Sequence, residues 1–179
     1  FTVAVTAVND APTLAAIADP AAILEDAGAQ TVSLTGIAAG GGETQVLTVT
    51  ATSSNTALIP NPTVTYTSAA TTGSLSYTPV ANASGTAIIT VTVTDDGGTT
   101  NSGVATTTRT FTVAVTAVND APTLAAIANP TAILEDAGAQ TVSLTGIAAG
   151  GGETQGLTIT ATSSNTALIP NPTVTYTSA

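Results

Sequence analysis

The chain contains an internal repeat, because residues 1–69 recur as residues 111–179 at an offset of 110 residues. Four pairs of positions differ between the two copies: Asp19/Asn129, Ala21/Thr131, Val46/Gly156 and Val49/Ile159. A period of this length corresponds to a whole domain rather than to one coil of a solenoid. The sequence therefore predicts tandem domains of nearly identical structure.

Within one period, short runs alternate apolar residues with Thr or Ser. They cover residues 1–8, 13–18, 30–37, 45–52, 63–68, 74–79, 86–94 and 108–118. Alternation with a period of two is typical of half-buried antiparallel strands, and β-branched Val, Ile and Thr favour them. Turn-forming residues separate the runs, and Gly40–Gly42 reads as a hairpin turn because neither Lys nor a helix follows it. The pattern predicts an all-β fold, an immunoglobulin-like sandwich of about seven strands in each repeat.

The composition excludes most chemistry. The chain has no Cys, His or Lys, and its one cation, Arg109, stands against 11 acidic residues. Common zinc sites, thiolate nucleophiles, Ser-His-Asp triads and P-loops therefore lack their essential residues. A net charge of −10 argues against nucleic acid and anionic membrane surfaces. No stretch reaches the roughly 20 apolar residues that span a bilayer. We expect a protein that is not an enzyme and does not insert into a membrane.

The acidic residues lie outside the alternating runs. In the complete period they are Asp10, Asp19, Glu25, Asp26, Glu43, Asp95 and Asp96. In a sandwich these positions are loops or strand ends, which gather at the two poles. Like charges about 4 Å apart repel by about 1 kcal/mol in water, and a divalent cation would relieve that repulsion. The alternative is that the acids only solvate the turns, where Asp and Asn suit the backbone geometry.

Three segments resemble parts of a known family. FTVAVTAVNDAPT resembles the last strand and linker of a cadherin-type repeat, ILEDAGAQTVSL the following first strand, and TAIITVTVTDDGG the penultimate strand with its acidic turn. The chain is thus similar to the bacterial cadherin-like repeats of giant surface adhesins, with a VNDAP linker. With that linker as boundary, residues 1–8 end a preceding repeat, 9–118 form a complete repeat and 119–179 an incomplete one. A circularly shifted boundary fits the period equally well.

The resemblance also implies calcium at the junctions between repeats, where six to eight oxygens surround the ion. The site before the complete repeat would use Asn9, Asp10, Glu43, Asp95 and Asp96. The next site would use Glu25 and Asp26 from one repeat with Asn119, Asp120 and Glu153 from the following one. The acidic pair recurs one period later as Glu135 and Asp136.

Near-identical neighbours without catalytic groups predict one mechanical task performed many times. We expect an extension module of a long extracellular protein on a bacterial cell surface, an adhesin stalk whose partners are neighbouring identical repeats. The alternative is a homopolymer, a self-assembling extracellular filament or sheath completed by strand exchange between neighbours. A glycosidase or sugar-binding module has little support, because the acids lie at turns and the chain has no Trp.

Overall fold

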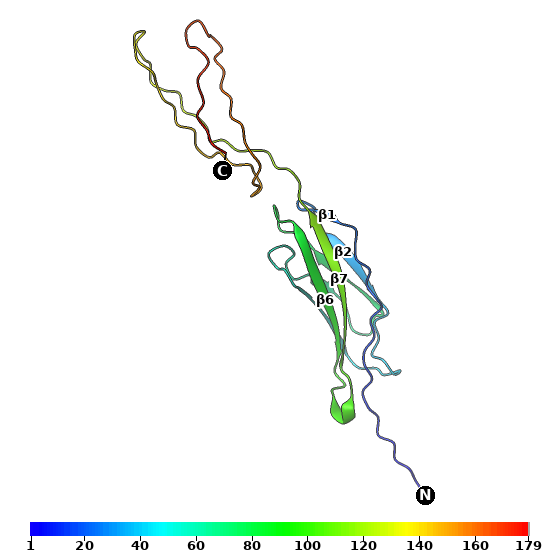
Figure 1. Cartoon of the computed structure of the whole chain (residues 1–179). Helices are drawn as coiled ribbons and strands as arrows, with labels where there is room; N and C mark the ends of the chain where they lie inside the picture. Colours follow the sequence, from blue (N-terminus) through cyan, green and yellow to red (C-terminus); the bar gives the residue numbers. More distant parts are fainter. Residues whose placement is uncertain (179) are drawn as a thin grey trace. The chain divides into compact units, whose positions relative to one another are not determined.

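A computed structural model describes residues 1–178, and the chain divides into two compact units, Phe1–Val118 and Asn119–Ala179. The first unit is built from strands (Figure 1). These are β1 (Ile23–Leu24), β2 (Gln30–Thr35), β3 (Leu47–Ser53), β4 (Thr63–Thr65), β5 (Thr72–Tyr77), β6 (Gly85–Asp95) and β7 (Thr106–Thr116), with a 3-10 turn, η1, at Thr100–Ser102. No helix among the described residues has the length and apolar character needed to cross a bilayer.

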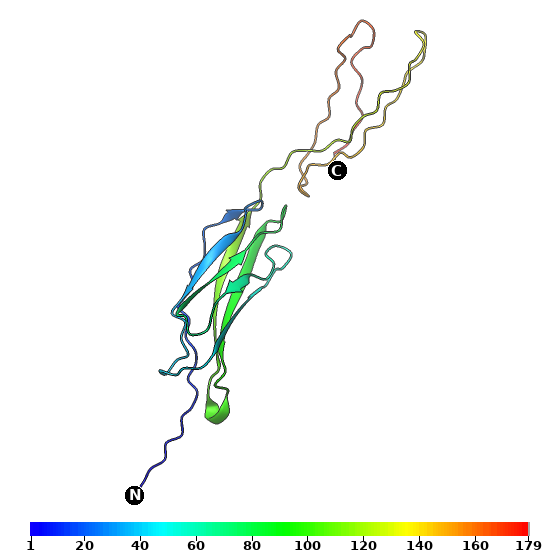
Figure 2. The same cartoon turned by 180° about the vertical axis from the view of Figure 1, so that it is seen from behind.

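The strands form two sheets, with strand orders β1-β7-β6-β3 and β2-β5-β4. The first sheet is built on β6 and β7, two long antiparallel strands that lie side by side in both views (Figures 1 and 2). Strand β3 pairs antiparallel with the other edge of β6, and the two-residue β1 pairs in parallel with the end of β7. In the second sheet, β5 pairs antiparallel with β2 and β4. The expected all-β fold with two sheets is confirmed.

Side chains from both sheets share one core. Along β6 the apolar residues Ile89, Val91 and Val93 are fully buried, while the Thr residues between them are partly exposed. Phe111 on β7 and Leu34 on β2 belong to the same cluster. Each such side chain contributes about 1.5–3 kcal/mol through burial. The period of two seen in the sequence is therefore the alternation between core and solvent.

Two predicted strands are not formed in the first unit. Residues 13–18 make only a bridge between Thr13 and Ala38, although Leu14 is buried. Residues 1–8 are exposed and form no strand, even though the identical sequence at 111–118 supplies part of β7. The reason is pairing: β6 already has β7 on one edge and β3 on the other.

The second unit keeps local hydrogen bonds of the first but not its sheets. The bridge between Thr123 and Ala148 repeats that between Thr13 and Ala38, and the same turn closes at Gly150. Residues 119–178 contain no named strand. In the first unit, the matching segments pair with β5 and β6, whose sequences do not recur in the second unit.

The missing pairing leaves apolar side chains in contact with solvent. Leu168 and Ile169 are 73% and 47% exposed, whereas their counterparts Leu58 and Ile59 are 2% and 0% exposed. The same residues are therefore core in one unit and surface in the other.

Candidate functional site

The most connected polar side chain of the first unit is Asn9, where the chain enters the fold. Its amide nitrogen donates to Oδ1 of Asp95 at 3.0 Å, to the carbonyl of Gly98 at 3.1 Å and to the carbonyl of Val104 at 2.8 Å. Its amide oxygen accepts from Nε2 of Gln45, and its backbone carbonyl accepts from the Val104 amide at 3.0 Å. Asn9 thereby ties the loop before β3 to the turn between β6 and β7.

Glycines make room for this side chain. A Cβ on Gly97 would lie 1.9 Å from Oδ1 of Asn9, and one on Gly103 would lie 3.0 Å from the Asn9 Cβ. The Gly97 amide also donates to Oδ1 of Asp95 at 3.0 Å. Asp95 is 5% exposed, and its Oδ2 and Oε1 of Gln45 are buried without a hydrogen-bond partner among the described residues. In the described part of the chain, only Oδ1 of the Asp95 carboxylate thus accepts hydrogen bonds, from Asn9 and the Gly97 amide.

The three-glycine turn holds the next residue, Asp10. The Asp10 amide donates to Oε2 of Glu43 at 3.1 Å, and a Cβ on Gly41 would lie 2.0 Å from Oδ2 of Asp10. Gly40 and Gly41 have φ values of 92° and 49°, which non-glycine residues rarely adopt. The second unit repeats the arrangement, with the Asp120 amide 3.0 Å from Oε2 of Glu153. The predicted turn at Gly40–Gly42 therefore also packs against the linker residue Asp10.

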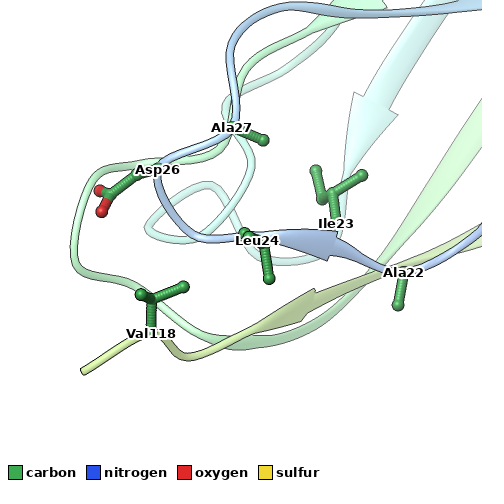
Figure 3. Close-up of a pocket in the computed structure, with 6 residues that line it drawn as sticks. All are labelled: Ala22, Ile23, Leu24, Asp26, Ala27 and Val118. Carbon is green, nitrogen blue, oxygen red and sulfur yellow. The ribbon is translucent and has the colours of Figure 1, made fainter.

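At the opposite end of β7, Glu25 holds the point where the chain leaves the unit. Its side chain is 4% exposed, and Oε1 accepts from the Val118 amide at 2.7 Å. The backbone amide of Glu25 donates to the Thr116 carbonyl at 3.1 Å. Beside this turn lies an open, mostly apolar pocket, in which the Asp26 carboxylate turns away from Ile23 and Leu24 (Figure 3). The pocket is lined by Ala22, Ile23, Leu24, Asp26, Ala27 and Val118.

The structure brings some of the predicted metal ligands together and separates others. Asn9 meets Asp95, and the Asp10 amide meets Glu43. Oδ1 of Asp96 instead accepts from the Val46 amide at 2.9 Å. Asp26, Glu135 and Asp136 are exposed, and in the second unit Asn119 accepts from Gln155 while Asp120 meets Glu153. Most of the buried or bonded acids accept backbone hydrogen bonds.

At the Asn9 pole, two of the residues taken from the resemblance, Asn9 and Asp95, are joined by a hydrogen bond from the Asn9 amide. Asn9 turns its amide nitrogen, and not its oxygen, toward Asp95 and the two carbonyls. Nowhere within residues 1–178 do three or more acidic side chains lie close enough together to hold a metal ion. Calcium binding by the wider set stays a prediction.

Sequence reasoning missed Gln45 and the glycines at 97 and 103. No sequence signal singled them out, because all but four of positions 1–69 recur one period later. The hydrogen bond from Gln45 to Asn9 is formed again between Gln155 and Asn119. A calcium site would use the amide oxygen of Asn9, whereas the structure places the amide nitrogen against Asp95.

No family model matches the sequence, and no curated protein matches it significantly. Solved structures give distant similarities. Titin domains Z1Z2 in complex with telethonin align with 68% of this chain and 55% of that chain, at 16% identity and a TM-score of 0.42. Domains 4 and 5 of the S-layer protein SbsC align with 58% of this chain and 53% of that chain, at 18% identity and a TM-score of 0.35. The chain thus spans about half the length of these two structures.

A longer SbsC structure, of domains 1–6, aligns with 64% of this chain and 15% of that chain, at 16% identity and a TM-score of 0.36. Similarities of this size assign neither a family nor a function.

Proposed function

We propose that this chain is a structural extension module of a long extracellular repeat protein of the cell surface. Its immunoglobulin-like sandwich repeats are joined end to end at the Val-Asn-Asp-Ala-Pro linker. The observation that carries the proposal is the path of the chain through the first unit. Asn9 is bonded to Val104, two residues before β7, and the chain leaves at Val118, two residues after it (Figure 1). The chain enters and leaves at opposite ends of one strand.

This path makes each repeat a spacer. Strand β7 has 11 residues, so each copy adds about 35 Å along that strand at roughly 3.3 Å per residue. The four differences between the two copies support a single repeated task, because different binding tasks would need different loops. The local hydrogen bonds at the start of each unit are also the same.

The side chains support a structural role over a catalytic one. Five of the seven acids of the first unit accept hydrogen bonds from backbone amides, namely Asp19, Glu25, Glu43, Asp95 and Asp96. Most outward positions of β3, β6 and β7 carry Thr, with Ile88 and Ala114 as exceptions, which suits a weakly charged extracellular surface. We propose that the partners of each repeat are its neighbours in the array.

Small-angle scattering on proteins with two, three and four copies of residues 9–118 tests the proposal. We expect the maximum dimension to increase by a constant step of at least about 35 Å for each added copy. Matched proteins with a Gly-Ser spacer before each Asn9 provide the flexible reference. A series whose dimensions follow the flexible reference, or stay compact, would falsify the extension role.

A second candidate is a filament or sheath in which neighbouring chains complete each other. Leu124 and Leu168 favour it, because they are 50% and 73% exposed in the second unit, whereas their counterparts Leu14 and Leu58 are buried in the first. A strand added from another chain would cover such residues and pair the free backbone groups. Sedimentation of residues 1–179 and 9–118 over a wide concentration range separates the two candidates. Association confined to the longer protein supports the filament, and monomers at every concentration contradict it.

A further inference from the structure

The geometry points to an amide in the place of a metal ion at the pole where the chain enters the unit. The Asn9 amide nitrogen faces one carboxylate oxygen and two carbonyl oxygens, from Asp95, Gly98 and Val104. These are the hard oxygen donors that calcium takes, at 2.3–2.6 Å. Here the separations are 2.8–3.1 Å, as expected for hydrogen bonds. The N–H groups supply the positive end of the interaction.

The orientation of the amide is fixed by its neighbours. The three oxygens accept but cannot donate, so the nitrogen must face them. Gln45 donates Nε2 to the other side of the same amide, which requires an oxygen there. A flipped Asn9 would oppose oxygen to three oxygens and nitrogen to nitrogen. When no cation is bound, these hydrogen bonds therefore require this orientation of the Asn9 amide.

The residues around the Asn9 side chain are also tightly packed. A side chain at position 97 would collide with the Asn9 amide, and Gly103 packs against the Asn9 Cβ. Asp95 is 95% shielded from solvent, and its Oδ1 receives both Asn9 and the Gly97 amide. Because these bonds hold the point where the chain enters, the pole is locked without a metal ion. This inference rests on the extension role, for which the lock provides stiffness that does not depend on calcium.

The substitution Asn9→Asp tests this exchange of roles. It removes two donor hydrogens and places a second carboxylate beside Asp95, so that two carboxylates and two carbonyls face one another. Such a set repels itself when empty and offers calcium several of the oxygens it requires. We expect the stability of the Asn9→Asp variant to depend on calcium.

The second unit provides a matched control. Asn119 has the same sequence neighbours and the same bond from Gln155, but its amide nitrogen donates to the Asp120 carbonyl. Counterparts of Asp95, Gly98 and Val104 are not present in this unit. Asn119→Asp should therefore change neither thermal stability nor its response to calcium.

Thermal unfolding of residues 1–179, followed by circular dichroism in excess EDTA and in excess calcium chloride, is the measurement. The unchanged chain should melt at the same temperature in both. Asn9→Asp should melt several degrees lower in EDTA and recover in calcium, with about one calcium bound by calorimetry. Folding of this variant only after calcium is added supports the proposal equally.

Three results would overturn the inference. They are a calcium-dependent melting temperature in the unchanged chain, an Asn9→Asp variant indifferent to both additions or unfolded in both, and an equal calcium response in Asn119→Asp. None of them alters the scattering increment expected for each added copy. A failed increment would refute the extension role and leave the melting result intact.

Discussion

Replacing Glu25 with alanine removes a buried carboxylate that holds the last residue of the first unit. Oε1 of Glu25 lies 2.7 Å from the Val118 amide nitrogen, and the side chain is 4% exposed. A hydrogen bond to a charged group contributes about 1.5–3 kcal/mol. We expect Glu25→Ala to lower the free energy of unfolding by about 2 kcal/mol. Glu25→Gln keeps an oxygen acceptor without the charge and should cost about 1 kcal/mol.

Urea unfolding followed by circular dichroism measures this change. With an m-value of about 2 kcal/mol per molar urea, the alanine variant should shift the midpoint by about 1 M. Hydrogen exchange of the Val118 amide should accelerate in the same variant, since its acceptor is gone.

The repeat supplies the control for this prediction. Glu135 has the same sequence context but is exposed in the second unit, so Glu135→Ala should change the free energy of unfolding by no more than about 0.5 kcal/mol. Equal shifts for Glu25→Ala and Glu135→Ala, or no shift for either, would refute the reasoning. In either case, the hydrogen bond from the Val118 amide to Glu25 would not be the source of the stability.

Three further predictions concern the core and the turns, each measured by chemical unfolding. Ile89→Ala should cost about 2–5 kcal/mol because the side chain is fully buried, whereas Ile88→Ala, 49% exposed on the same strand, should cost less than about 1 kcal/mol. Gly41→Ala should cost more than about 1 kcal/mol, because φ is 49° and a Cβ would meet a carboxylate 2.0 Å away, while Gly28→Ala meets nothing within 4 Å and should be nearly neutral. Burial raises the pKa of Tyr77, so the neutral phenol is favoured in the fold and stability should fall as pH rises above about 10. Tyr77→Phe should make that fall smaller, and similar falls in both proteins would contradict the assignment.

The sequence predicted the strand pattern where apolar and Thr residues alternate over long runs. The runs at 86–94 and 108–118 correspond to β6 and β7, because alternation over many residues reports which face is buried. The alternation did not mark the two-residue β1, since a segment this short carries no period, and only the resemblance assigned Ile23 and Leu24 to a first strand. Its parallel pairing with β7 joins Ile23 and Leu24 to Val115 and Thr116, which lie more than 90 positions later in the sequence.

The acidic poles were only half predictable. Asp96 follows a strand and is exposed, as its position in the sequence predicted. Asp95 is instead the last residue of β6 and is buried in the same alternation as Val91 and Val93, which the sequence did not predict because charged side chains are rarely buried. The donor atom of Asn9 was not predictable, since an amide offers oxygen or nitrogen according to its partners. Those partners come from residues 86 or more positions away in the sequence, with the exception of Gln45.

The repeat separates what sequence alone determined from what tertiary structure decided. The turns at Gly40 and Gly150 form alike in both units, because their hydrogen bonds join residues a few positions apart. Residues 30–35 form β2, and the identical residues 140–145 form no strand. A strand requires a partner for its backbone groups and a core for its apolar face, and both come from distant residues. Sequence determined the local turns and the alternation, whereas long-range pairing decided which copy became a sheet.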